Sequence, residues 1–201
     1  MAVITISRQM GSLGRDVARA AAERLGYRVV WRDLINQAAR RSGAPEAALM
    51  EFDELGLLGM RMSAHASKAY REAVQAVMLE LAAEDNVVIV GRAGQVILRD
   101  QPRVLHVRVT APPDVRAQRV AETDGIPIEA AAARVSASDD YRRRYLRRFY
   151  HVRWDDPDLY DLVINTARVS VPAAAELICL ALSRSLMPGP AEPSPATGSQ
   201  L

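Results

Sequence analysis

The segment NVVIV, residues 86–90, places the strongest constraint on the fold of this chain. It is continuously apolar and rich in β-branched residues, a pattern typical of a parallel strand buried on both faces. A strand is buried in this way when helices cover both sides of its sheet. The segment therefore predicts a central parallel strand and, along the rest of the chain, further strands that alternate with helices.

The remainder of the sequence shows this alternation. The other predicted strands are Ala2–Ser7, Tyr27–Trp31, Val104–Val109 and Leu159–Asn165. Apolar residues at helical spacing predict helices at 15–25, 32–41, 45–55, 64–83, 113–123, 128–150 and 172–186. The predicted fold class is α/β, a three-layer parallel sheet with helices on both faces. Residues 1–186 are predicted to form a single domain, and the Pro-, Gly- and Ser-bearing residues 187–201 a disordered tail.

The basic residues are unusual in kind. Lys68 is the one lysine among 26 basic residues, so an anion site must be built from arginines and backbone N–H groups, with this residue the sole exception. The formal net charge of +2 does not indicate a general nucleic-acid surface. No leader segment and no run of membrane-spanning length is present, and Cys179 is alone, so we expect a soluble, cytoplasmic protein that contacts no membrane.

Three turns carry polar or glycine residues directly after predicted strands. They are Ser7–Gly14, Gly91–Gly94 and Thr110–Pro113. In an open parallel sheet the ligand crevice lies at the carboxyl ends of the strands, so we expect these turns to converge in space.

The first turn, SRQMGSLGRD, has the layout of an anion site. Gly11 and Gly14 permit backbone conformations that turn successive N–H groups toward one ligand, and the helix that follows adds its positive end. Arg15 and Arg8 offer donors that suit phosphate oxygens. An ordinary strand-to-helix turn with solvated arginines explains the same residues equally well.

Two further features concern arginines. Arg92 follows the strongest strand and needs an anionic partner, which is either a substrate phosphate or a structural carboxylate. Asp139 and Arg142 are three residues apart on a helix, so the carboxylate either orients the guanidinium or joins it at one ligand. The remaining arginines between 143 and 148 are interpreted as a solvated face. His106 lies within a strand and is interpreted as packed, whereas Trp31 caps the crevice or fills the core.

Taken together, four blocks resemble the cytidylate kinase-like branch of the P-loop nucleoside monophosphate kinases, over Val3 to about Leu182. They are ITISRQMGSLGRDVA, VGRAGQVIL, APPDVRAQRV and SDDYRRRYLRRFYHVRWDDPDLYDLVINTARV. The resemblance implies a P-loop NTPase-type fold with a helical lid. It also implies ATP and Mg²⁺ as cofactors and a small-molecule nucleotide as substrate.

The resemblance also assigns residues by position. The implied cofactor-binding residues are Arg8, Gly11, Ser12, Leu13, Gly14, Arg15, Asp16, Arg116 and Arg119, the last two as lid arginines. The implied catalytic residues are Arg15, Arg92, Asp139 and Arg142, and the implied metal ligand is Asp16.

The first loop departs from the P-loop pattern at Arg8, which stands where the first glycine of the standard loop would be, and at three further positions. Gly14 stands at the lysine position, Asp16 at the Ser/Thr position, and Leu13 replaces a glycine. Loss of one electrostatic contact to a transition state commonly costs about 3–4 kcal/mol. Arg15 offers a replacement charge, although its side chain leaves the helix in another direction.

Three functions therefore remain open. The first is ATP-dependent phosphoryl transfer to a CMP- or dCMP-like nucleoside monophosphate or a similar small phosphate acceptor. The second is a non-catalytic module that binds a nucleotide or phosphometabolite, and the third is a structural protein with a relic pocket.

Overall fold

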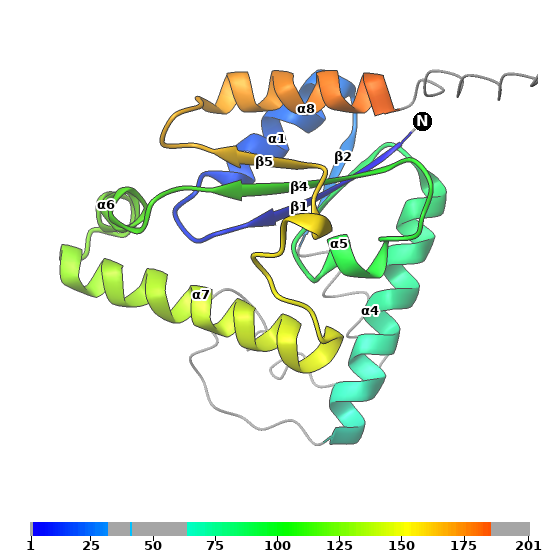
Figure 1. The fold of residues 1–201 in the computed structure, drawn as a ribbon, viewed down its shortest axis with the longest axis horizontal. Helices are drawn as coiled ribbons and strands as arrows, with labels where there is room; N and C mark the ends of the chain where they lie inside the picture. The colour runs from blue at the N-terminus through cyan, green and yellow to red at the C-terminus, as the bar shows by residue number, and fades with distance from the viewer. Residues whose placement is uncertain (1, 32–40, 42–63, 186–201) are drawn as a thin grey trace, which may run out of the picture.

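The computed structural model describes residues 2–31, 41 and 64–185 (Figure 1). Its strands are β1 (Val3–Arg8), β2 (Arg28–Val30), β3 (Val87–Val90), β4 (Val104–Thr110) and β5 (Leu162–Asn165). Its helices are α1 (Gly14–Leu25), α4 (Ala64–Glu84), α5 (Gly94–Ile97), α6 (Pro113–Asp124), α7 (Ile128–Tyr150) and α8 (Val171–Ser185), with a 3-10 helix η1 (Pro157–Leu159).

The five strands form one parallel sheet in the order β2-β3-β1-β4-β5. Parallel neighbours require crossovers, and the helices between the strands supply them. β1 occupies the middle, with Val3 in register with both Val87 of β3 and Val104 of β4. All four residues of β3 are buried, as the NVVIV pattern predicts for an interior strand.

The two faces of the sheet bury alternate residues of the same strands. Ile4 and Ile6 of β1 pack with α1 and α8, whereas Val3 packs with α4 on the opposite face. The small residues of α1, including Ala18 and Ala21, are fully buried and let this helix approach the sheet closely. The predicted three-layer arrangement is therefore confirmed.

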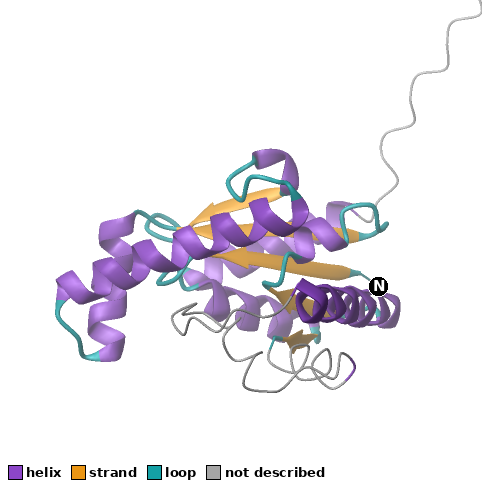
Figure 2. Cartoon of the chain, turned by 90° about the horizontal axis from the view of Figure 1, so that it is seen from below, coloured by secondary structure: helices purple, strands orange, loops and turns teal. Residues whose placement is uncertain are grey.

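A pair of helices covers the carboxyl edge of the sheet. Figures 1 and 2 show α6 and the start of α7 beyond the tips of the strand arrows. Pro113 lies in the first turn of α6, and Gly125 ends this helix with a φ of 63°. Val120 of α6 and Val135 of α7 share a small core with Met10 of the first loop. The helical pair is thus packed against the turn that was predicted to bind an anion.

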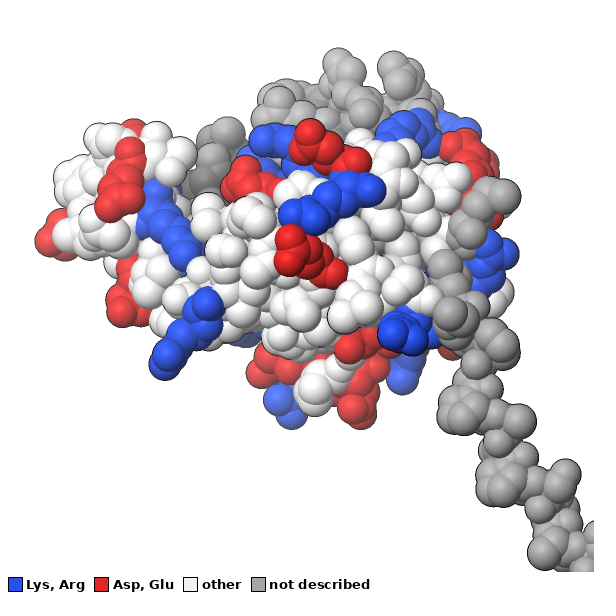
Figure 3. Space-filling view, turned by 90° about the horizontal axis from the view of Figure 1, so that it is seen from above, with Lys and Arg blue, Asp and Glu red and all other residues white. Residues whose placement is uncertain are grey.

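The surface over α1 and α8 carries charges of both signs. Figure 3 shows Lys and Arg interspersed with Asp and Glu on this face, among many uncharged residues. Arg24 of α1 and Glu176 of α8 form an exposed ion pair there, with 2.9 Å between Nη2 and Oε1. None of the helices in the described ranges combines the length and apolar character that crossing a membrane requires.

Some predicted elements differ from the structure or lie outside it. The last strand begins at Leu162 rather than at Leu159, because Asp156 accepts a hydrogen bond from the Asp158 N–H and stabilises η1 instead. The short helix α5 was not predicted. The predicted helix 45–55 and tail 187–201 lie outside the described residues, as does 32–41 except for Arg41.

His106 of β4 lies packed within the sheet, where it faces Thr5. Its Nδ1 is 2.7 Å from Thr5 Oγ1, and burial lowers the pKa of the imidazole although the Asp161 carboxylate opposes this. The unfolded chain therefore binds this proton more tightly than the folded chain does. We expect the free energy of unfolding to fall as the pH drops below about 6.5.

Urea unfolding at a series of pH values from 7.5 to 5 measures this effect. The variant His106→Gln should have a flatter profile, whereas His151→Gln, a change at an exposed histidine, should keep the wild-type slope. A wild-type slope in His106→Gln would show that other groups cause the acid sensitivity.

Candidate active site

The loop between β1 and α1 has a backbone that few side chains allow. Gly11 has a φ of 73° and Leu13 a φ of 58°, both in the left-handed region. A Cβ atom on Gly11 would lie 2.5 Å from the carbonyl oxygen of Arg116. The glycine therefore permits a close approach between this loop and the start of α6.

Four successive carbonyl groups of this loop are hydrogen-bonded from the protein side. The Gln9 carbonyl accepts from Ser12 Oγ at 2.9 Å, and the Met10 carbonyl from Arg116 Nη1 at 3.3 Å. The Gly11 carbonyl accepts from Arg119 Nη1 at 3.2 Å, and the Ser12 carbonyl from Thr166 Oγ1 at 2.8 Å. These four bonds fix the orientation of the peptide planes.

The orientation of the carbonyls determines where the N–H groups point. In a trans peptide the C=O and the following N–H point in opposite directions. Among the described residues, the N–H groups of Met10, Gly11, Leu13 and Gly14 have no protein acceptor. These donors face away from the bonds that hold the loop, which is the arrangement of an anion cradle.

The start of α1 adds to this cradle. Leu13 is the N-cap and makes no capping bond through its side chain, so the first turn of a 12-residue helix keeps its unsatisfied N–H groups. A pocket borders the loop and this turn, and we call it the loop pocket. It is lined by Arg8, Gln9, Met10, Gly11, Leu13, Gly14, Arg15, Asp16, Arg119, Val120, Thr123 and Asp124. Leu13 thus lies at the wall of an open pocket.

Arg15 points away from the centre of the cradle. Its guanidinium carbon lies 3.5 Å from the ring centroid of Trp31, a cation–π geometry. The side chain lines the rim of the loop pocket while Trp31 lines the neighbouring pocket. The direction expected from the sequence, away from the lysine position, agrees with this contact.

Asp139 and Arg116 occupy a different position from the one expected. They form a buried bidentate pair, with Nη2–Oδ2 and Nη1–Oδ1 distances of 2.8 Å and 3.2 Å. Their side chains are only 6% and 2% exposed. Arg116 Nε also donates to the Ala111 carbonyl, so its donors face protein groups rather than a pocket. Arg116 was expected to be a lid arginine over the cofactor, and in this structure it lies behind the loop and contacts protein groups.

Asp139 joins several elements rather than acting on Arg142 alone. Its Oδ2 also accepts from Gln9 Nε2 at 3.4 Å, while the Gln9 Oε1 accepts from the Ala111 N–H at 3.3 Å. Arg142 donates to the carbonyl and the hydroxyl of Ser138. The three-residue spacing places Asp139 and Arg142 about one turn apart on α7, and Asp139 forms its closest ion pair with Arg116 of α6.

Arg119 also supports the loop from behind. Besides the Gly11 carbonyl, it donates to the Thr166 carbonyl at 2.9 Å and to Thr166 Oγ1 at 3.1 Å. Because the same residue lines the loop pocket, it combines a structural contact with a charge at the pocket wall.

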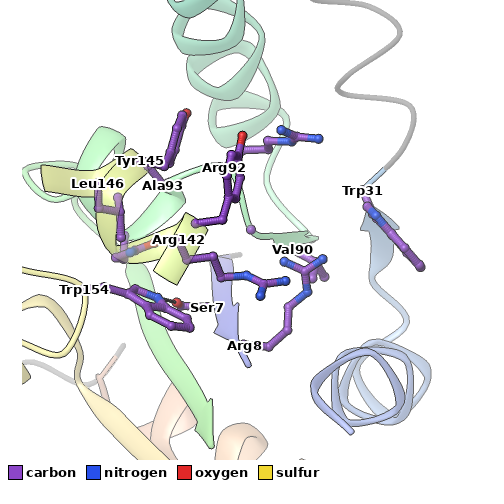
Figure 4. A pocket seen from close by; sticks show the side chains of 13 residues that line it. Ser7, Arg8, Trp31, Val90, Arg92, Ala93, Arg142, Tyr145, Leu146 and Trp154 are labelled. Carbon is purple, nitrogen blue, oxygen red and sulfur yellow. Dashed lines mark hydrogen bonds between the residues drawn. The ribbon is translucent and has the colours of Figure 1, made fainter. Parts of the chain in front are cut away.

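A second pocket, the arginine pocket, lies beside the first. Arg8, Arg92 and Arg142 line it together with Ser7, Trp31, Val90, Gly91, Ala93, Gln95, Tyr141, Tyr145, Leu146 and Trp154. Figure 4 shows the side chains of Arg8 and Arg142 pointing toward each other from β1 and α7. The turn after β3 holds Arg92 with φ values of 80°, 57° and 60° at residues 91–93. Strained backbone of this kind occurs often at functional sites.

One wall of the arginine pocket was missed by sequence reasoning. Trp154 Nε1 donates to Ser7 Oγ at 2.9 Å, and Tyr160 donates to the Trp154 carbonyl at 2.7 Å. Arg108 donates to the same carbonyl, and its guanidinium carbon is 4.6 Å from the Trp154 ring centroid. Arg142 lies 5.8 Å from that ring. Trp154 therefore contacts one buried and one pocket-lining guanidinium.

The sequence does contain a signal for this wall. Arg108 interrupts the apolar strand VLHVRVT, where a buried cation needs partners. The part of the chain that the structure describes places no carboxylate within ion-pair distance of Arg108, so the rings of Trp154 and Tyr160, the Trp154 carbonyl and the Tyr160 hydroxyl stabilise it. The buried charge adds a positive potential behind the arginine pocket.

The donors for a divalent cation are few. Asp16 is exposed, lies 3.8 Å from Arg19 and lines the loop pocket with Asp124. Within residues 2–31 and 64–185, no cluster of three or more His, Cys, Asp or Glu side chains is present. Magnesium commonly uses one or two carboxylates together with phosphates and waters, so the donor chemistry of Asp16 fits such an ion.

The strand order, the glycine-bearing loop after β1 and the helix that starts there define a P-loop kinase-type α/β protein. The model of the cytidylate kinase-like family matches residues 3–168, and the chain belongs to this family. A cytidylate kinase of Pyrococcus horikoshii is 30% identical over 169 residues, which cover 84% of this chain and 81% of the relative. A cytidylate kinase of Ignicoccus hospitalis is 29% identical over 89% of this chain and 97% of the relative.

Two solved structures support the fold. An uncharacterized protein from Eubacterium ventriosum aligns with a TM-score of 0.72 at 22% identity, over 91% of this chain and 99% of that one. Shikimate kinase from Acinetobacter baumannii aligns with a TM-score of 0.54 at 18% identity, over 93% and 96% of the two chains.

Proposed function

We propose that this protein transfers the terminal phosphoryl group of ATP to a nucleoside monophosphate of the CMP or dCMP type, or to a similar small phosphate acceptor. The observation that carries the proposal is the loop whose carbonyls are held from behind, which leaves its N–H groups for phosphate oxygens. The arginine pocket beside this loop supplies positive charge for a second phosphate. The names of the relatives support the same chemistry.

Each group has a distinct role in this proposal. The N–H groups of Met10, Gly11, Leu13 and Gly14 would hold the outer phosphates of ATP, whereas the Ser12 N–H donates to the Gln9 carbonyl. Arg92 and Arg142 would bind the phosphate of the acceptor. Trp154, Tyr141 and Tyr145 would lie beside the base of the acceptor. Arg15 would add charge at the rim, while Arg116, Arg119 and Asp139 would position the loop.

The reaction requires position and positive charge more than proton transfer. An oxygen of the acceptor phosphate forms a bond to the γ-phosphorus as the bond to the bridging oxygen breaks, and that electron pair stays on ADP. Positioning and electrostatic stabilisation dominate such transfers. Asp16 would hold Mg²⁺, which when bound neutralises phosphate charge.

A non-catalytic module that binds a nucleotide or phosphometabolite is the second candidate. Gly14 favours this non-catalytic module, because it provides no side chain at the position where P-loop kinases carry a lysine. ADP release from ATP, measured with a panel of monophosphates, separates the two candidates. Turnover with one acceptor supports the kinase, whereas calorimetric binding of ATP, ADP or CMP without turnover supports the module. No binding with or without Mg²⁺ would contradict both.

Arg142→Ala tests the proposed acceptor site. Because it removes one electrostatic contact to the reacting phosphates, we expect kcat to fall about 10²- to 10³-fold. Coupled ADP release measures the rate, and thermal unfolding should show little change. Arg144→Ala removes the same charge from an exposed position of α7 and should keep the wild-type rate. Equal rates in the two variants would contradict this role of Arg142.

A further inference from the structure

The side chain of Arg8 and the missing side chain of Gly14 are linked by packing. A Cβ atom on Gly14 would lie closer than 3.0 Å to Arg8 Cβ and 3.1 Å from Arg8 Cγ. These atoms are at the base of the arginine and cannot swing away as its far end can. A lysine at position 14 and the observed Arg8 therefore exclude each other.

A second glycine accommodates the far end of the same side chain. Gly91, at the end of β3, has a φ of 80°, and a Cβ atom there would lie 2.8 Å from Arg8 Nη1. Arg8 thus runs from the end of β1, past the first residue of α1, to the backbone of the neighbouring strand. Two positions without side chains border this path.

The path leads to the boundary between the two pockets. Of the described residues that line them, Arg8 alone is common to the loop pocket and the arginine pocket. Figure 4 shows its guanidinium on the side of Arg142. A phosphoryl group that passes from a donor on the loop to an acceptor in the arginine pocket must cross this boundary.

We infer that Arg8 supplies the charge that a lysine supplies in other P-loops, and that its guanidinium contacts the transferring phosphoryl group between donor and acceptor. The inference rests on the proposed function. A guanidinium fork suits two phosphate oxygens at once, whereas an ammonium is a point charge. Glycine at position 14 is then the condition that lets Arg8 reach the site, rather than a sign of a decayed loop.

An exchange of the two side chains tests this inference. Arg8→Ala should lower kcat at least 100-fold with little change in Tm, because it removes the charge without creating an overlap. Gly14→Lys should lower both kcat and Tm, because the new side chain overlaps Arg8. The double variant Arg8→Gly/Gly14→Lys should regain at least 10-fold in kcat over either single change. Arg24→Ala, which removes a charge from α1 at a residue that lines neither pocket, is the matched control and should keep the wild-type rate.

The outcomes separate this inference from the proposed function. A double variant no faster than the slower single variant, together with Arg8→Ala at the wild-type rate, would overturn the inference while the kinase function stands. If the wild type turns over no acceptor, the proposed function fails, and calorimetry with ATP decides the role of Arg8. In that case at least a 10-fold weaker ATP affinity in Arg8→Ala, with Arg24→Ala unchanged, supports the phosphate contact, and equal affinities overturn it.

Discussion

Asp139→Ala should lower the free energy of unfolding by about 3–5 kcal/mol, because it leaves the guanidinium of Arg116 buried without its charge partner. The two side chains are 6% and 2% exposed, so water cannot replace the lost carboxylate. Equilibrium urea unfolding measures the change. Asp140→Ala, at the neighbouring residue, removes only an exposed ion pair with Arg143 and should cost at most about 1 kcal/mol.

A double variant strengthens the test. Arg116→Met/Asp139→Leu removes both charges. Its loss of stability should therefore be smaller than the sum of the losses in Arg116→Met alone and Asp139→Leu alone. If Asp139→Ala retained full stability but lost phosphoryl transfer, Asp139 would act on the substrate itself, as the family resemblance implies. Lost stability with a normal rate in the folded fraction would establish the supporting role.

Gly11→Ala should weaken the binding of ATP and destabilise the fold. The new Cβ atom would lie 2.5 Å from the Arg116 carbonyl oxygen and 3.0 Å from its Cα and Cβ atoms, so the loop must move away from α6. A misplacement of about 1 Å at such a site commonly costs about 10²-fold in rate. We expect a loss of ATP affinity of about 10²-fold by calorimetry.

Gly125→Ala is the matched control for this change. Gly125 also has a positive φ, of 63°, but no atom lies within 4 Å of the position of its Cβ. Gly125→Ala should therefore lower the free energy of unfolding only by the cost of an alanine in the left-handed region, about 1–2 kcal/mol. If Gly11→Ala and Gly125→Ala weakened ATP binding by the same factor, the contact between the loop and Arg116 would not hold the cradle in place.

The alternation of strands and helices could be predicted from the sequence because it depends on local patterns. Residues 87–90 of the run NVVIV form β3 and are buried, whereas Asn86 is exposed, and the middle position of the sheet belongs to β1. Strand order depends on how the crossover helices pack, and the residue pattern of one strand does not show which strands pair with it. The start of β5 was misplaced for a related reason, since the turn at Asp156 competes with the strand pattern.

The candidate site was predicted in composition but not in its internal contacts. The glycine-bearing loop and the arginines at strand ends follow from residue types, and the structure brings Arg8, Arg92 and Arg142 to one pocket. The partner of Asp139 did not follow from its spacing to Arg142. Sequence spacing within one helix reveals neighbours on that helix, whereas Arg116 approaches from another helix.

The sequence by itself determined that this chain forms a parallel sheet with a glycine-bearing loop, and that any anion it binds must meet amides and guanidinium groups. Only the tertiary structure decided which arginines support the loop and which face a ligand. The physical reason is the rotation and separation of packed elements: Arg116 is buried between α6 and α7, whereas Arg8 passes Gly14 and Gly91 to reach the boundary of two pockets.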